Sequence, residues 1–380
     1  MEIGCIREIM KDESRVGLRP DNLGVAEILA LGATNTIRVA KSAGKKSGFL
    51  DDEYERQGAL VLPHIDVWRH SELIVKVKQP LEDEYPYLWD DQILICFPHL
   101  ADNPLLLDVS LKKRLTIIAY ETIRFENGYH HILAEMSKIA GRKALFDCTN
   151  LLMSKNGMML GPNSEILILG LGNAGAAAAE LAVAANPKFL YLLDKNPEKF
   201  EPLKRRFYQR LSPYNLWFME YDQVDPAHQR SLASILTHID LLIAATYIDG
   251  ELQTKAVPEW MEKGMKPGSV TADISIDQGG AMETSNYHKQ TGKQIFKKHG
   301  VWHYCVPNIP GRVPRDSTPA LTRETFHYIS QLAEKGFKQA VLENPALARG
   351  VNTYKGWITH EGLARSIGQM KKYKPLSELL

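Results

Sequence analysis

The segment LILGLGNAGAAAAELA, residues 167–182, constrains the fold more than any other part of the sequence. Its glycines Gly170, Gly172 and Gly175 have the G-x-G-x-x-G spacing and lie between an apolar run and an alanine-rich stretch. This pattern is typical of the turn between a strand and a helix that binds a dinucleotide. In such a turn, backbone N–H groups at the helix N-terminus, including those of Asn173 and Ala174, face the pyrophosphate. An ordinary strand-to-helix turn is the alternative.

A carboxylate further along the chain favours the dinucleotide. Twenty-two residues after Gly172, the run FLYLLD ends in Asp194, which can accept hydrogen bonds from the ribose hydroxyls. Flavin proteins usually carry this motif near the start of the chain, whereas a complete βα unit precedes it here. We therefore predict the cofactor NAD. Asp194 would repel the 2′-phosphate of NADP, although Lys195 and Lys199 oppose that effect.

Strand-like and helix-like patterns alternate twice along the chain, which predicts an α/β fold with two doubly wound parallel sheets, Rossmann-like, and a cleft between them. The predicted domains are a discontinuous substrate domain, residues 1–132 and 311–380, and an NAD-binding domain, residues 133–310. Polar segments 154–164 and 307–317 are candidate hinges. From about Thr318 the chain is expected to be mainly helical and to return to the first domain.

The expected strands are EIGCI, TNTIRVA, LIVKVKQ, QILICF, TIIAY, EILILG, FLYLLD, DLLIAAT, SVTADISI and WHYCVP, and NLGVAEILALG is an expected amphipathic segment.

Composition narrows the class of protein. The 380 residues exceed what one hydrophobic core usually supports. The 46 Lys and Arg residues balance 45 Asp and Glu, without blocks of like charge, which disfavours nucleic-acid and membrane binding. Neither a signal peptide nor a run of 18 apolar residues is evident, so we expect a cytoplasmic protein. The widely spaced cysteines are expected to be reduced core residues, and no metal is predicted.

Polar residues that follow predicted strands are the candidates for chemistry, because ligands of parallel sheets gather at the carboxyl ends of strands. These candidates are Arg15, Lys78, His99, Asp277 and Asn308. Arginine and lysine can bind a carboxylate and polarise a carbonyl, and histidine can exchange protons near neutral pH. A carboxylate can orient water or an amine. Each residue also has a purely structural interpretation. Arg15 could be a solvated loop residue, Lys78 could protect a sheet edge, and His99 could be a structural histidine. Asp277 could cap the turn at the following glycines, and Asn308 could be a turn residue.

Ordered motifs along nearly the whole chain resemble the alanine dehydrogenase and proton-translocating transhydrogenase family. Arg7 and Glu8 begin this agreement, which continues through ESRVGLRP, LIVKVKQP, QILICFPHLA, IAYETI, LAEMSKIAGR, MKPGSVTADISIDQGG and STPALT. The motifs PHLA and IDQGG resemble the soluble alanine dehydrogenase branch.

The resemblance implies reversible oxidative deamination of a small L-amino acid, alanine to pyruvate and ammonia, with NAD. It implies that Arg15 and Lys78 bind the substrate carboxylate and keto oxygen. It implies that His99 is the general acid and base, assisted by Asp277. Asn308 would contact substrate or nicotinamide, and Ser137 would contact the cofactor. The resemblance also implies a homo-oligomer, a hexamer.

Three segments depart from the family pattern. The segment before the second strand series, SKNGMMLGPNS, is short; the loop TYIDGELQT contains Tyr247 and Asp249; and residues after Gly280 lack an Arg-Pro-Thr run. The altered loops leave open an opine-forming or lysine-type amino-acid dehydrogenase. A catalytically silent NAD-binding regulator is a further alternative, since fold and cofactor do not guarantee chemistry.

Overall fold

The computed structural model describes residues 1–23, 35–246 and 255–380, which form two compact units. Unit 1 comprises Met1–Met136 and Gly311–Leu380, and unit 2 comprises Ser137–Pro310. The first division falls inside helix α6 (His131–Asn156), because Ala144, Cys148 and Leu152 on this helix join the apolar core of unit 2. The polar segment 154–164, one of the two expected hinges, therefore lies within unit 2.

The sheet of unit 1 is doubly wound. Its described strands are β1 (Glu2–Cys5), β2 (Thr36–Ala40), β3 (Leu60–Leu62), β4 (Leu73–Lys78), β5 (Ile93–Phe97), β6 (Thr116–Ala119), β14 (Val351–Tyr354) and β15 (Trp357–Ile358). They lie in the order β15-β14-β6-β5-β4-β1-β2-β3. Strands β1 to β6 are parallel, and the order reverses between β1 and β4, which is the position where such sheets bind ligands.

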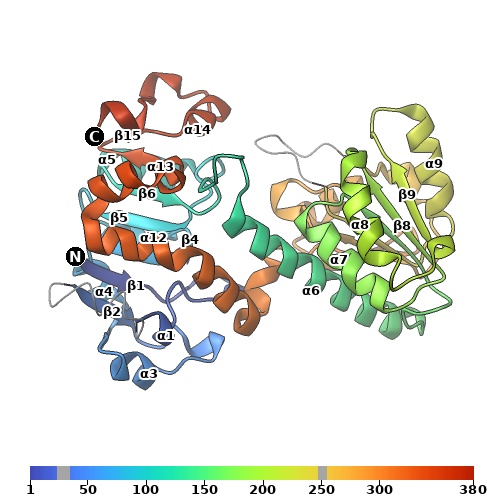
Figure 1. The fold of residues 1–380 in the computed structure, drawn as a ribbon, viewed down its shortest axis with the longest axis horizontal. Coiled ribbons are helices and arrows are strands. Elements are labelled where there is room, and N and C mark those ends of the chain that lie inside the picture. The colour runs from blue at the N-terminus through green and yellow to red at the C-terminus, as the bar shows by residue number, and fades with distance from the viewer. Residues whose placement is uncertain (24–34, 247–254) are drawn as a thin grey trace. The chain divides into compact units, whose positions relative to one another are not determined.

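Helices complete unit 1, and α12 lies across its sheet (Figure 1). The described helices, besides the start of α6, are α1 (Pro20–Leu23), α3 (Asp51–Arg56), α4 (His64–Arg69), α5 (Pro104–Lys112), α12 (Pro314–Glu343), α13 (Pro345–Gly350) and α14 (Glu361–Ser366). Helix α5 begins where it does because Asn103 accepts a hydrogen bond from the N–H of Leu106 and Pro104 occupies the first turn.

The six parallel strands of unit 2 have the same order as those of unit 1. The described strands of unit 2 are β7 (Glu165–Leu169), β8 (Phe189–Asp194), β9 (Leu216–Glu220), β10 (Leu241–Ala244), β11 (Val270–Asp273), β12 (Ile295–Lys298) and β13 (Val301–Tyr304), in the order β12-β13-β11-β10-β7-β8-β9. Only β12 among these is antiparallel. The described helices, besides the larger part of α6, are α7 (Asn173–Ala184), α8 (Phe200–Phe207), α9 (Pro226–Leu236), α10 (Glu259–Glu262) and α11 (Asn286–Thr291).

Both faces of the unit 2 sheet are buried. Ile166 and Ile168 of β7 join one apolar cluster, and the alternate residues Leu167 and Leu169 join the other. Such central parallel strands are apolar throughout, which explains why the sequence pattern predicts them. The two sheets confirm the predicted fold class of two doubly wound, Rossmann-like units.

The strands that the sequence pattern does not predict lie at or beside sheet edges: β3, β9, β12, β14 and β15. Polar residues are tolerated there, so these strands lack the continuous apolar run of a central strand. The C-terminal part of the chain was expected to be mainly helical, but it also contains the strands β14 and β15. The expected amphipathic segment NLGVAEILALG lies, apart from its first two residues, outside the described part of the chain.

Candidate functional site

Three predicted site residues of unit 1 follow neighbouring strands. Arg15 lies in the loop after β1, Lys78 ends β4, and His99 follows β5 by two residues. The amino group Nζ of Lys78 lies 3.2 Å from Nε2 of His99. The positive charge of Arg15 also acts on the His99 ring. The structure therefore brings together two cations and an imidazole at the carboxyl edge of the sheet.

His99 has a constrained backbone and an accessible ring. Its φ of 46° lies in the left-handed region, and its backbone N–H donates a 3.0 Å hydrogen bond to Oε1 of Glu121. The ring stacks on Phe97, while 40% of the side chain is exposed. Desolvation, and then the charges of Lys78 and Arg15, lower the pKa of His99 to about 3. The imidazole is therefore neutral at physiological pH and can accept a proton.

Arg15 is held by protein groups on one side. Its Nε and Nη2 donate to the carboxylate of Glu13 at 2.9 and 2.6 Å, and both side chains are buried. Its Nη1 lies 3.1 Å from the sulfur of Met136, a weak acceptor. Glu13 thus fixes the orientation of the guanidinium, with Nη1 beside Met136.

A buried ion network lies below Lys78 on the same strand. Lys76 Nζ is 3.3 Å from carboxylate oxygens of both Glu8 and Glu84, and all three side chains are at most 3% exposed. Oε1 of Glu8 also accepts the backbone N–H of Val77 at 2.7 Å. Glu8 therefore fixes the end of β4 and with it the position of Lys78.

In unit 2 the three glycines of the turn have different surroundings. Gly170 has a φ of 92°, and a Cβ there would lie 2.6 Å from the carbonyl oxygen of Ala245. A Cβ on Gly175 would lie 1.8 Å from the carbonyl oxygen of Gly170. A Cβ on Gly172, in contrast, meets no atom within 4 Å. The turn is closed on the protein side and open at Gly172, where Asn173 and Ala174 begin helix α7.

Asp194 ends β8 beside this turn, and its carboxylate is already engaged. Its Oδ2 accepts the N–H of Leu171 at 2.6 Å, and its Oδ1 accepts the N–H of Asn196 at 2.8 Å. Lys199 Nζ lies 3.0 and 2.9 Å from the two oxygens. Asp194 therefore links β8 to the glycine turn, and the half-exposed Lys199 offsets part of its negative charge.

The other predicted residues of unit 2 include a neighbouring pair. Asp277 is exposed in a short 3₁₀ turn (Ile276–Gln278), and its Oδ2 accepts the backbone N–H of Asn308 at 3.1 Å. Asn308 has a φ of 50°. Ser137 lies on α6 and is partly exposed. Tyr247 and Asp249 lie outside the described residues.

Asp273, which the sequence pattern did not single out, stabilises the turn that contains Asp277. This buried carboxylate accepts hydrogen bonds from the N–H groups of Ser275, Ala281 and Met282 and from the hydroxyl of Ser285. A Cβ on Gly280 would lie 2.7 Å from its Oδ2, so only glycine fits there. Asp273, rather than Asp277, thus stabilises the turn at the two glycines.

Glu121, Glu13 and Glu8 were also missed as site residues, although Glu8 begins the family-like motif. Each carboxylate accepts a hydrogen bond from a part of the site that the sequence pattern identified. Glu121 accepts from His99, Glu13 from Arg15, and Glu8 from the end of β4. A polar residue just after a strand is the signal that could have found Glu121, since it follows β6 by two residues.

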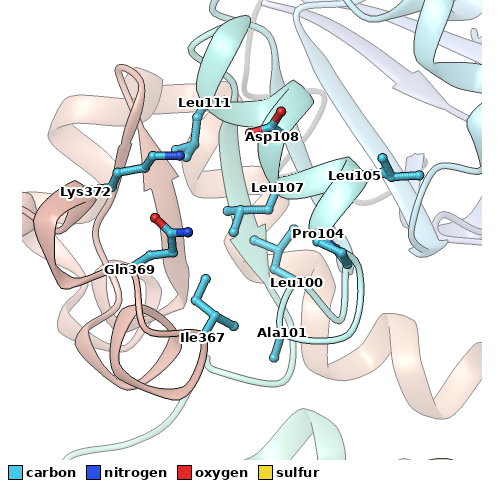
Figure 2. Close-up of a pocket in the computed structure, with 10 residues that line it drawn as sticks. All are labelled: Leu100, Ala101, Pro104, Leu105, Leu107, Asp108, Leu111, Ile367, Gln369 and Lys372. Carbon is cyan, nitrogen blue, oxygen red and sulfur yellow. The ribbon is translucent and has the colours of Figure 1, made fainter.

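A pocket of about 350 Å³ lies elsewhere in unit 1, between α5 and the C-terminal segment (Figure 2). Its lining includes Leu100, Leu107 and Ile367, with Asp108 and Lys372 as charged groups. No predicted site residue lines it.

Within residues 1–23, 35–246 and 255–380, no His, Cys, Asp and Glu side chains cluster in a way that could hold a metal, and no helix has the length and apolarity of a membrane span. The four cysteines are buried free thiols.

Known proteins match both halves of the chain. The family model described as alanine dehydrogenase/PNT, N-terminal domain, matches residues 4–140, and that of the C-terminal domain matches residues 151–361. Alanine dehydrogenase of Staphylococcus haemolyticus is 37% identical over 377 residues, which are 97% of this chain and 96% of the relative. Alanine dehydrogenase 2 of Staphylococcus aureus strain N315 is 36% identical over the full length of both chains.

Solved structures agree. An L-alanine dehydrogenase structure has a TM-score of 0.86 and 32% identity, covering 97% of this chain and 99% of its own. A transhydrogenase from Sinorhizobium meliloti, at 21% identity and a TM-score of 0.76, shows the shared fold alone. These matches confirm the resemblance seen in the sequence motifs, and the chain belongs to the alanine dehydrogenase/PNT family.

Proposed function

We propose that this protein is an NAD-dependent oxidoreductase that converts L-alanine and water reversibly to pyruvate and ammonia. Full-length relatives named alanine dehydrogenase support this reaction. The observation that carries the proposal is the pair formed by Lys78 and the neutral His99, with Nζ and Nε2 3.2 Å apart. This pair joins an electrophilic ammonium to a proton acceptor, the two groups that deamination of an amino acid needs.

Unit 2 would hold the dinucleotide. The open side of Gly172 and the first N–H groups of α7 fit the pyrophosphate, with Gly170, Asn173, Ala174 and Gly175 shaping the turn. Asp194 would hold the adenosine ribose and Ser137 would contact the cofactor. When bound, the nicotinamide supplies the two-electron oxidant that accepts the α-hydride. We assign NAD rather than NADP because Asp194 carries a negative charge at the ribose position.

Unit 1 would bind and turn over the substrate. Arg15 binds the carboxylate through Nη1, and Lys78 donates a hydrogen bond to the oxygen on the α-carbon. Loss of one ammonium proton to solvent and of the α-hydride leaves a protonated 2-imino acid, water adds to its α-carbon, and the carbinolamine expels ammonia to give pyruvate. His99 Nε2 accepts the proton from the attacking water and returns it to the departing amine. Asp277 and Asn308 of unit 2 would assist water and orient the ligands.

A spectrophotometric panel tests the reaction. The protein is incubated with NAD⁺ and single L-amino acids, and NADH is followed at 340 nm. We expect L-alanine to give the highest kcat/KM. Faster oxidation of lysine, or NADH-dependent condensation of pyruvate with an amino acid, would assign the lysine-type or opine-forming reaction instead. NADH binding without any turnover would identify a silent regulator.

We also propose a homo-oligomer, a hexamer, working in the cytoplasm, where its four buried thiols remain reduced. Light scattering at assay concentrations tests the assembly, and a monomeric mass would contradict it.

A further inference from the structure

Glu121 contacts the proton acceptor without belonging to the residues assigned above. It follows β6, the strand next to β5, so it shares the sheet edge with His99. Its Oε1 accepts the His99 backbone N–H at 3.0 Å and lies 3.8 Å from Nδ1 of the same residue. Its Oε2 is buried and has no hydrogen-bond partner among the described residues. Glu121 therefore contacts His99 through Oε1 and keeps unused acceptor capacity on Oε2.

The contacts of His99 define which ring nitrogen carries the proton. Nε2 faces the ammonium of Lys78, which can only donate, so Nε2 must be the acceptor. A neutral imidazole then carries its hydrogen on Nδ1. Nδ1 lies 3.8 Å from Oε1 of Glu121, which is too long for a hydrogen bond but close enough for the carboxylate charge to favour a hydrogen on Nδ1. Lys78 and Glu121 thus favour the same tautomer from opposite sides of the ring.

We propose that Glu121 is a positioning residue for His99: its carboxylate fixes the left-handed backbone, selects the Nδ1–H tautomer, and stabilises the imidazolium that forms when Nε2 accepts a proton. The expected effect on catalysis rests on the proposed function. The Nδ1–H tautomer follows from the contacts of His99 and does not depend on that function. The negative charge of Glu121 has its effect when His99 becomes positive, since opposite charges this close attract each other.

The groups around Glu121 are consistent with this role. Lys78 on β4 and His99 face its carboxylate, the buried thiol of Cys96 lies on β5, and His130 contacts its backbone carbonyl. Burial, partly offset by hydrogen bonds and by Lys78, raises the pKa of Glu121 to about 7. The carboxylate is therefore ionised above neutral pH, where it can support the protonated form of His99.

The first test compares Glu121→Gln with Glu121→Ala. Glutamine keeps the acceptor for the His99 N–H but removes the charge. We expect Glu121→Gln to lower kcat by about 10- to 100-fold, the size seen for carboxylates that orient metal-bound histidines, with the KM for L-alanine nearly unchanged. Wild-type kcat/KM should rise with pH through about 7, and this inflection should be absent from the glutamine variant. Glu121→Ala should lose at least as much turnover.

Asp102→Asn is the matched control, because Asp102 is an exposed carboxylate in the same loop whose backbone N–H donates to the carbonyl of His99. It should keep wild-type turnover and pH profile. Unchanged kcat and profile in Glu121→Gln would overturn the proposal. A rise in the KM for alanine without a fall in kcat would also overturn it, because Glu121 would then bind the substrate ammonium.

The second test needs no activity. The full-length protein labelled with ¹⁵N-histidine should show His99, assigned by its loss in His99→Gln, as the Nδ1–H tautomer. This tautomer should persist in Lys78→Met and be lost in Lys78→Met/Glu121→Ala. If the double variant keeps it, Glu121 does not select the tautomer. Failure of the amino-acid panel together with the expected NMR result would reject the proposed function while retaining this positioning role.

Discussion

Nζ of Lys78 lies 3.2 Å from Nε2 of His99, so its positive charge adds to the effect of burial in keeping the imidazole neutral and able to accept a proton. This geometry changes one expectation. A histidine acting near neutral pH would titrate near its usual pKa, but desolvation and the two neighbouring cations lower the pKa of His99 to about 3. A titration near neutrality in the activity profile is instead expected from Glu121, whose pKa is about 7.

Replacement of His99 tests whether it is catalytic. We expect His99→Ala to lower kcat by about 10²- to 10⁴-fold, the usual contribution of a general acid and base. The affinity for NADH, measured by fluorescence titration, should not change, because the glycine turn and Asp194 lie in unit 2. His70→Ala, at an exposed histidine of unit 1, is the control. Near-wild-type turnover in His99→Ala would make His99 structural and exclude the proposed proton transfers.

Replacement of Lys78 separates its two roles. Lys78→Met removes a cation from the His99 ring, so the pKa of His99 should rise from about 3 towards its ordinary value, as measured by NMR titration. Loss of the donor to the substrate oxygen should lower turnover by roughly 100-fold. If the His99 pKa does not move, Lys78 is not the cation that holds the ring neutral.

The sequence predicts the parts of this site that have a local signature. The glycine turn has fixed spacing, and Arg15, Lys78, His99 and Asp277 are polar residues that follow apolar strands. The partners of these residues have no such signature. Glu13 and Glu121 act through pairing with Arg15 and His99, and their contacts depend on strand order and side-chain orientation. Asp273 lies inside a strand pattern, and only the folded turn shows four donors converging on its carboxylate.

Two glycines of the dinucleotide turn should respond differently to alanine. Gly172→Ala adds a methyl group to open space, so melting temperature should be kept while NADH binding weakens by about tenfold or more, since the backbone can no longer approach the pyrophosphate. Gly175→Ala places a methyl group 1.8 Å from the carbonyl oxygen of Gly170 and should destabilise unit 2. Equal losses of stability in both variants would argue against an open phosphate site at Gly172.

The contact between Lys199 and Asp194 should set the degree of cofactor preference. Wild-type protein is expected to bind NADH more tightly than NADPH, and Lys199→Ala should increase this ratio because the Asp194 charge is no longer neutralised. Asp194→Asn removes the charge and keeps one of the two oxygens that accept the N–H groups of Leu171 and Asn196, and it should decrease the ratio. Fluorescence titration with both cofactors measures these changes. A wild-type preference for NADPH would refute the assignment of Asp194 as the ribose ligand.

Glu262 provides a prediction about stability that is independent of function. Its carboxyl is fully buried on α10, where Thr284 Oγ1 lies 2.9 and 2.7 Å from its oxygens. Desolvation raises the pKa of Glu262 from 4.5 to about 8. Between these values the folded protein retains a proton that the unfolded chain releases, so stability must fall as pH rises across this window.

Glu262→Gln removes this titration and keeps an oxygen that can accept the Thr284 hydroxyl. Its melting temperature should match wild type near pH 4, where the acid is protonated in both states, and exceed it above pH 8, by roughly 2–4 °C for each kcal/mol recovered. Glu220→Gln, at an exposed carboxylate of unit 2, is the control and should follow the wild-type curve at every pH. If the difference between Glu262→Gln and wild type does not grow with pH, the buried carboxyl remains ionised in the folded protein, and a charged group in the unit 2 core must then be stabilising it.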